Sequence, residues 1–261
     1  MSEILTSGLT LMRRMPPGLG DKSIAGLSKL IDDEQTVDQI CQRVDKPFQI
    51  GHCSQTGQEF ILCEYNRDGD SYRSPWSNQY QPPISDAPHL SDALRKLEVK
   101  VNEEFNQYRR LYYDGGFSSV YFWDVGSNSF ACVFLIKRDC DPREGVAKAC
   151  WESTNLIQAE ITPQSKSVKY NITSTVFLQI SVEDANAGVM DLSGGLTRQY
   201  QEHKPCADPF GENHVYNMIA LVENMEGKLR SSLDMIYVGK TREILDRTRH
   251  VEIKKERVRL P

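Results

Sequence analysis

The longest regular pattern of apolar positions in the chain runs from Asn213 to about Thr248. Apolar residues recur there at steps of three and four, at Val215, Met218, Ile219, Val222, Met225, Leu229, Leu233, Ile236 and Tyr237. These steps place one apolar stripe along one side of an α-helix. A helix of about 35 residues reaches roughly 50 Å, which is longer than most single domains need. We therefore expect it to lie across a broad sheet.

From Ser118 onward the apolar pattern changes to a period of two, which is typical of β-strands. Five strands are predicted, over residues 118–125, 129–137, 147–161, 168–182 and 188–200. Their connections are short and turn-like and contain no helical pattern, so neighbouring strands must be antiparallel. The sequence therefore predicts a five-stranded meander, with the long helix covering one face.

The residues before the sheet predict helices. Three short amphipathic patterns precede Pro47, with a break at Met15-Pro-Pro-Gly18, and such helices usually pack on one another or on a partner subunit. A longer helix starts after Ser91 as N-cap and stops at Asp114-Gly-Gly116. Its predicted core stripe is Leu94, Leu97, Val101, Phe105, Tyr108 and Tyr112.

These patterns define an α+β fold. The predicted division is a helical stalk over 1–47, a small globule over 48–90, a helix over 91–116, the antiparallel sheet over 117–202, the long helix over 213–248 and a short basic tail over 249–261.

The small globule contains one strand candidate, residues 58–65, followed by a polar, turn-rich stretch over 66–78. Glu64, Asn66, Asp68 and Gly69 match the start of a calcium-binding EF-hand loop. However, Pro75 stands where such a loop needs a bidentate glutamate. We therefore expect no metal site here, but an ordered surface loop held by packing of the aromatic residues Tyr72, Trp76 and Tyr80.

Two glycine motifs suggest phosphate binding. Leu192-Ser-Gly-Gly-Leu196 resembles the signature loop of ABC-type ATPases, and Val238-Gly-Lys-Thr241 resembles the second half of a P-loop. Asp234 stands at the position of the first P-loop glycine, and the segment belongs to a helix rather than to a strand-to-helix turn.

The five histidines show no metal-ligand spacing, and no Gly-x-Ser-x-Gly elbow is present. We predict no catalytic residue and no cofactor, with nucleotide binding as a minor alternative.

Charge is distributed unevenly along the chain, whose net charge is −5. Residues 228–261 hold ten Lys/Arg and five Asp/Glu, so the rest of the chain is acidic. A basic end indicates an acidic partner surface or anionic lipid, although a solvated helix end explains it equally well. The sequence shows no basic stripe interleaved with aromatic residues, so nucleic acid is not the expected partner.

Seven cysteines without a Cys-x-x-Cys motif favour reduced cytosolic thiols. Neither a signal peptide nor a membrane span is predicted.

Several stretches together resemble the beta subunit family of the F-actin capping protein (CapZ), in order from about residue 9 to 245. They are Leu11-Met-Arg-Arg-Met-Pro-Pro17, Cys63-Glu-Tyr-Asn-Arg-Asp-Gly-Asp-Ser-Tyr-Arg-Ser-Pro-Trp-Ser-Asn78, Leu94-Arg-Lys-Leu-Glu-Val99, Ser118-Ser-Val-Tyr121, Gly194-Gly-Leu-Thr-Arg-Gln199 and Ile236-Tyr-Val-Gly-Lys-Thr241.

The resemblance implies an obligate heterodimer with a similarly folded alpha subunit, whose sheet continues this one. The implied function is non-catalytic capping of the barbed ends of actin filaments, in the cytoplasm and the cortical actin cytoskeleton. Dynactin, regulators of the CARMIL type, myotrophin and phosphoinositides are further partners that the family suggests. An alternative role is a structural end cap of dynactin's actin-like filament, without free capping activity.

By position, Arg230 corresponds to a basic residue that the family uses to contact actin. We add Lys240 and Arg242 as neighbours on the same exposed face, and Ile244 and Leu245 complete the predicted actin-binding set.

The tail departs from the family pattern. Relatives continue past the Gly-Lys-Thr stretch into an amphipathic helix, the tentacle, which binds a groove on actin. Here the chain reaches Pro261 through a basic segment with poor helical periodicity. A divergent tail, an isoform and an incomplete chain all fit this observation. On this basis we expect a cap that dissociates faster than a full-length relative.

Overall fold

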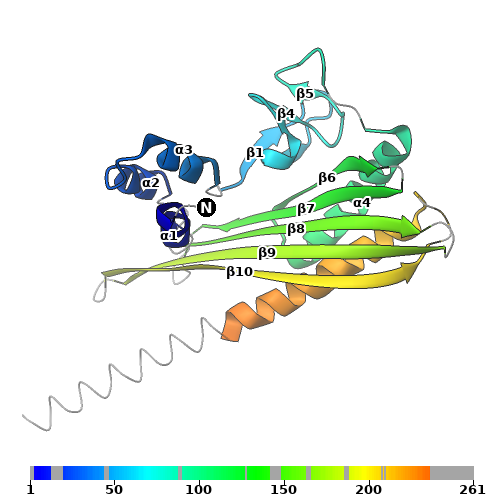
Figure 1. Ribbon diagram of the computed structural model, residues 1–261. Helices are drawn as coiled ribbons and strands as arrows, with labels where there is room; N and C mark the ends of the chain where they lie inside the picture. Colours follow the sequence, from blue (N-terminus) through cyan, green and yellow to red (C-terminus); the bar gives the residue numbers. More distant parts are fainter. Residues whose placement is uncertain are drawn as a thin grey trace, which may run out of the picture.

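The fold is α+β, as the sequence predicts: a helical stalk, a small globule and a five-stranded antiparallel sheet with two helices on one face (Figure 1). The computed structural model describes residues 3–12, 20–43, 47–87, 90–126, 128–141, 148–162, 166–184, 188–206, 208 and 210–235. None of the described helices is long and apolar enough to cross a membrane.

Three helices form the stalk, namely α1 (Glu3–Met12), α2 (Gly20–Ser28) and α3 (Glu34–Arg43). They bury a small core of their own around Leu5, Met12 and Ile40. Helices α1 and α3 approach closely at Gly8, where an added Cβ would lie 2.7 Å from the Ile40 side chain. This packing makes the stalk a unit with its own apolar centre.

The small globule is more regular than the sequence suggests, because it holds two small sheets rather than one strand and a loop. They are built from β1 (Gln49–His52) with β2 (Glu59–Leu62), and from β3 (Arg67–Asp68), β4 (Ser71–Arg73) and β5 (Tyr80–Gln81), with the 3₁₀ turn η2 (Glu64–Asn66) between them.

A buried amide side chain orders the loop of the globule. The side chain of Asn66 is 2% exposed, and its Nδ2 donates to the carbonyls of Ile61 and Arg73 at 3.3 and 2.9 Å. Its Oδ1 accepts from the Cys63 amide at 3.0 Å. The Asn66 side chain therefore points inward and bonds the backbone. It does not face the loop interior as a calcium ligand would.

Helix α4 (Asp92–Tyr112) anchors the globule through a buried ion pair. The Nη1 and Nη2 atoms of Arg73 donate to Glu98 at 2.7 Å each, and Arg95 and the Phe122 amide also donate to this carboxylate. Glu98 is fully buried, in the middle of the apolar stripe.

Two details of α4 differ from the sequence-based prediction. The Ser91 side chain makes no capping hydrogen bond and donates to Asp124 instead. The last member of the predicted core stripe, Tyr112, is 48% exposed because the helix ends there and its ring lies at the margin of the core.

The main sheet is a meander in the order β10-β9-β8-β7-β6, with every neighbouring pair antiparallel. Side chains alternate between its faces, so Val120 and Phe122 pack against the helices while Tyr121 packs against the globule. The strand bounds are β6 (Phe117–Gly126), β7 (Ser129–Cys140), β8 (Lys148–Thr162), β9 (Ser167–Asp184) and β10 (Gly188–Pro205).

The second helix on this face covers residues 213–235, and we call it the C-terminal helix (orange in Figure 1). Its predicted stripe is confirmed within these residues, because all its members are buried except Ile219, which is partly buried. Leu229 and Leu233 pack on Val176 of β9. Ile236, Tyr237, the predicted continuation to residue 248 and the tail over 249–261 lie outside the described residues.

The Arg73–Glu98 pair generates a stability prediction. Replacing Arg73 with Met leaves a buried carboxylate with Arg95 as its remaining cation, and breaking a buried ion pair costs about 3 kcal/mol or more. We expect a loss of this size in the free energy of unfolding, measured by urea denaturation. The matched control is Arg67→Met, which breaks an exposed pair with Glu64 and leaves the midpoint unchanged. Equal effects of the two substitutions would contradict the role given to Glu98.

Candidate functional site

One of the five predicted actin-binding residues, Arg230, lies on the C-terminal helix within the described chain. The other four, Lys240, Arg242, Ile244 and Leu245, lie outside the described residues, so the structure does not place them relative to Arg230. Within the described residues, the candidate site consists of Arg230 and the side chains around it.

Arg230 lies in an aromatic slot formed by Tyr112, Tyr113 and Trp151. Its guanidinium carbon is 5.7, 5.2 and 5.9 Å from the centres of the three rings. The two tyrosines come from the end of α4, and the tryptophan comes from β8. Such cation–π contacts hold a guanidinium over the ring faces while leaving its edge accessible. The sequence predicts an exposed basic residue here, whereas the structure shows a half-buried one.

A hydrogen bond adds direction to this packing. Arg230 Nη2 donates to the Tyr113 hydroxyl at 2.9 Å. Among the described residues this is the one hydrogen-bond acceptor recorded for the Arg230 side chain. A guanidinium carries five N–H donors, so the group retains donors for a partner.

Below the slot lies the fully buried carboxylate of Glu226, one turn before Arg230. It accepts four hydrogen bonds: from the hydroxyls of Tyr108, Tyr113 and Ser153 at 2.9, 2.7 and 2.5 Å, and from Asn155 Nδ2 at 2.8 Å. Two carboxylate oxygens offer about four acceptor sites, so this set of donors saturates the group. Glu226 thereby connects the C-terminal helix to α4 and to β8.

Burial sets the protonation of the tyrosines in this cluster. It raises the pKa of Tyr113 and of Tyr108 well above the usual range, and the nearby negative charge of Glu226 raises both further. Both hydroxyls therefore keep their protons and act as donors to the carboxylate. For Arg230, burial lowers the pKa, but interactions with Tyr113, Tyr108 and Glu226 outweigh it and the net shift is upward, so the group stays charged.

Two further cations lie at this helix, Lys228 on the helix itself and Arg198 on β10. Lys228 is exposed, with its Nζ 5.2 Å above the ring of Tyr200 on β10. Arg198 of β10 donates to Ser232 at 2.9 Å. Exposed acidic residues, Glu223 and Asp234, lie on the same helix. The described helix, residues 213–235, is thus nearly balanced in charge, and the basic excess in the sequence falls on residues beyond 235.

The described residues contain no cluster of three or more His, Cys, Asp and Glu side chains suited to a metal ion. The P-loop-like stretch Val238-Gly-Lys-Thr241 lies outside the described residues. The glycine motif Leu192–Leu196 lies inside β10 and pairs along its length with β9, so its backbone is extended rather than wrapped around a phosphate. What the site offers is an ordered guanidinium, a group well suited to binding carboxylates on another surface.

Sequence reasoning missed Glu226, Tyr113 and Trp151. One signal for Glu226 was present, because it falls on the apolar stripe between Val222 and Leu229, where a solvated carboxylate does not belong. The aromatic residues gave no such signal, since their contact with Arg230 depends on the tertiary packing.

Comparisons with known proteins define the class of this fold. The solved structure of the homodimeric actin capping protein alpha subunit from Plasmodium berghei superimposes with a TM-score of 0.59 at 15% sequence identity, covering 93% of this chain and 94% of that chain. At this identity the likeness speaks for the fold, which is that of an actin capping protein subunit.

The sequence comparisons identify the family. The profile of F-actin capping protein, beta subunit, matches residues 5–245, and the chain belongs to this family. The F-actin-capping protein subunit beta of Caenorhabditis elegans is 40% identical over 252 residues, covering 97% of this chain and 91% of the relative. The subunits of the same name from Arabidopsis thaliana and Drosophila melanogaster are 41% and 39% identical over 246 and 253 residues, covering 92% and 97% of this chain and 93% and 90% of the relatives.

The four donors around Glu226 lead to a second stability prediction. In Glu226→Gln an amide with one acceptor oxygen and an NH₂ group faces four donors, so at least one buried donor loses its partner. We expect a loss of about 2–4 kcal/mol in the free energy of unfolding. The control is Glu223→Gln, at an exposed position that accepts one bond from Tyr112, where we expect no measurable change. Urea denaturation distinguishes the two, and equal midpoints for both variants would overturn the assignment.

Proposed function

We propose that this chain is the beta subunit of a heterodimer that caps the barbed ends of actin filaments and blocks subunit addition and loss. The observation that carries the proposal is the family match over residues 5–245, together with relatives near 40% identity that bear the name F-actin-capping protein subunit beta. The proposed activity makes and breaks no covalent bond. The protein acts in the cytoplasm, on the cortical actin cytoskeleton.

The free edge of the main sheet supports an alpha subunit as partner. Strand β10 has 18 residues and pairs within the described chain on one side alone, with β9. A long exposed edge of this kind offers backbone donors and acceptors to another strand. At the other edge, β6 is in contact with β2 of the globule. A sheet continued by a partner at β10 removes the exposed edge.

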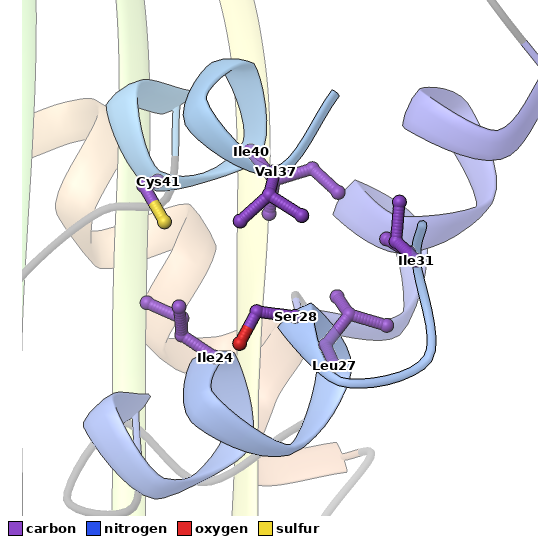
Figure 2. Close-up of a pocket in the computed structure, with 7 residues that line it drawn as sticks. All are labelled: Ile24, Leu27, Ser28, Ile31, Val37, Ile40 and Cys41. Atoms are coloured by element: carbon purple, nitrogen blue, oxygen red, sulfur yellow. The ribbon is translucent and has the colours of Figure 1, made fainter. Parts of the chain in front are cut away.

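The stalk offers a second surface for the partner. Figure 2 shows a shallow apolar depression between α2 and α3, lined by Ile24, Leu27, Ser28, Ile31, Val37, Ile40 and Cys41. Elsewhere on the stalk, Leu30 is 80% exposed and Ile4 on α1 is 56% exposed. Short amphipathic helices with exposed apolar residues are suited to packing against helices of a partner subunit.

The filament-end contact is proposed to include Arg230, Lys240, Arg242, Ile244 and Leu245. Arg230 fits this role because the aromatic slot holds its charge at the margin of the helix layer, where an acidic surface can reach it. The four residues beyond the described chain rest on the sequence alone.

The proposal predicts the behaviour of Arg230→Ala. In a seeded actin elongation assay with the alpha subunit co-expressed, the unmodified heterodimer should arrest barbed-end growth at substoichiometric amounts. Loss of a central interface arginine weakens binding by about tenfold or more. Added salt should weaken the unmodified cap more than the variant, because one charge of the contact is already gone.

The matched control is Lys96→Ala, which removes an exposed positive charge near the start of α4, about 24 Å along the helix from Tyr112. Its capping should equal that of the unmodified protein. Normal filament growth in the presence of a folded heterodimer would contradict free capping and favour the alternative role, an end cap built into dynactin's actin-like filament.

A stalk variant tests the partner surface. Leu30→Asp places a charge where the partner's helices are expected to pack, and loss of one buried leucine weakens such a contact by roughly tenfold or more. Subunit exchange, measured with a fluorescently labelled chain, should accelerate accordingly. Leu111→Asp, at an equally exposed position on α4, should leave exchange unchanged. Equal exchange rates for both variants would exclude the stalk from the interface.

A further inference from the structure

The Tyr113 hydroxyl makes two hydrogen bonds of opposite sense. It accepts from Arg230 Nη2 at 2.9 Å and donates to Glu226 Oε2 at 2.7 Å. A phenolic hydroxyl has a single proton, and a guanidinium can only donate, so the directions of both bonds are fixed. Glu226, Tyr113 and Arg230 thus form a chain from a buried carboxylate to a surface cation.

The buried end and the middle of this chain of hydrogen bonds, Glu226 and Tyr113, are each held by further contacts. Glu226 accepts from Tyr108, Ser153 and Asn155 as well, so its carboxylate keeps one position whether or not Tyr113 is present. Tyr113 itself is 6% exposed and caps α4, with its amide donating to the Arg109 carbonyl at 2.7 Å. After Tyr113 the polypeptide backbone turns through Gly115, whose φ of +71° favours glycine. The hydroxyl is therefore placed by the backbone on one side and by the carboxylate on the other.

Stacking alone does not fix the orientation of Arg230. Ring faces attract a cation over a broad area, so a guanidinium held by cation–π contacts can slide and rotate within the slot. The bond to a single hydroxyl specifies which nitrogen points inward and therefore which N–H groups face outward.

We propose that Tyr113 is a positioning residue for the filament-end contact: its hydroxyl, held by Glu226, orients the Arg230 guanidinium toward the filament. This inference rests on the proposed function and adds a residue that does not itself touch the filament. Pre-ordering a long side chain before binding reduces the entropy that association costs. The expected effect of losing the hydroxyl is therefore weaker binding at the filament end, with the charge of Arg230 retained.

The test uses Tyr113→Phe in the co-expressed heterodimer. The substitution keeps the ring and the stacking on Arg230 but removes both hydrogen bonds. Dissociation of the cap from barbed ends, followed by regrowth of capped seeds after dilution, should accelerate about fivefold, as expected for one hydrogen bond. The control Tyr170→Phe removes another buried hydroxyl under the same helix, one that bonds His214 and has no recorded contact with Arg230. Its dissociation rate should match that of the unmodified cap.

A double-mutant cycle separates positioning from general stability. If Tyr113 acts through Arg230, adding Tyr113→Phe to Arg230→Ala should leave the dissociation rate of the single Arg230→Ala variant unchanged. A purely structural role would move the rate in both backgrounds and would overturn the inference, as would a Tyr113→Phe cap that dissociates like the unmodified one. Absence of capping by the unmodified heterodimer would instead refute the proposed function, and the inference with it.

Discussion

Burial of the helix-facing side of the five-stranded sheet is the constraint on which the rest of the molecule depends. One continuous core joins β6 to β9 with α4 and the C-terminal helix. Apolar burial of this kind is strong but has no direction, so it does not by itself decide where along the sheet a helix comes to rest. Both helices carry a fully buried carboxylate in the middle of the apolar stripe, Glu98 and Glu226. Each carboxylate needs its donors at hydrogen-bond distance, and we infer that these requirements fix the register of the helices on the sheet.

The two faces of the sheet differ because only one is covered along its whole width. The globule packs on the other face near β6 and β7. Over β8 to β10 that face carries polar side chains that are exposed or half-buried, Thr154, Gln158, Asn171, Thr173, Thr175, Thr197, Gln199 and Gln201. An antiparallel sheet tolerates one solvated face, so this arrangement is stable as it stands. The unpaired edge at β10 is the part of the sheet that calls for another chain.

Much of the fold could be predicted from the sequence, because it follows from local periodicity. The stripe from Val215 to Leu233 and the alternation in the five strands each depend on neighbours within a few residues. The buried polar contacts could not be predicted in this way. Arg73 meets Glu98 from 25 residues away, and Tyr113 meets Glu226 from 113 residues away. Such pairs depend on the completed packing, although a carboxylate within an apolar stripe marks one partner of each.

The candidate site could be predicted from the sequence even less than the fold, because all its contacts join distant segments of the chain. Sequence alone identifies Arg230 as a cation on a helix, and a solvated surface position is the ordinary reading of such a residue. The slot that holds it is assembled from the end of α4 and the start of β8, two segments with no local relation to the helix. We infer that the orientation of the Arg230 side chain depends, through Tyr113, on Glu226, which is itself buried in the core. The core and the proposed contact surface are therefore coupled. Through the Tyr113 hydroxyl, two hydrogen bonds connect Glu226, which we infer helps to fix the register of the helix, to Arg230, which we propose faces a partner.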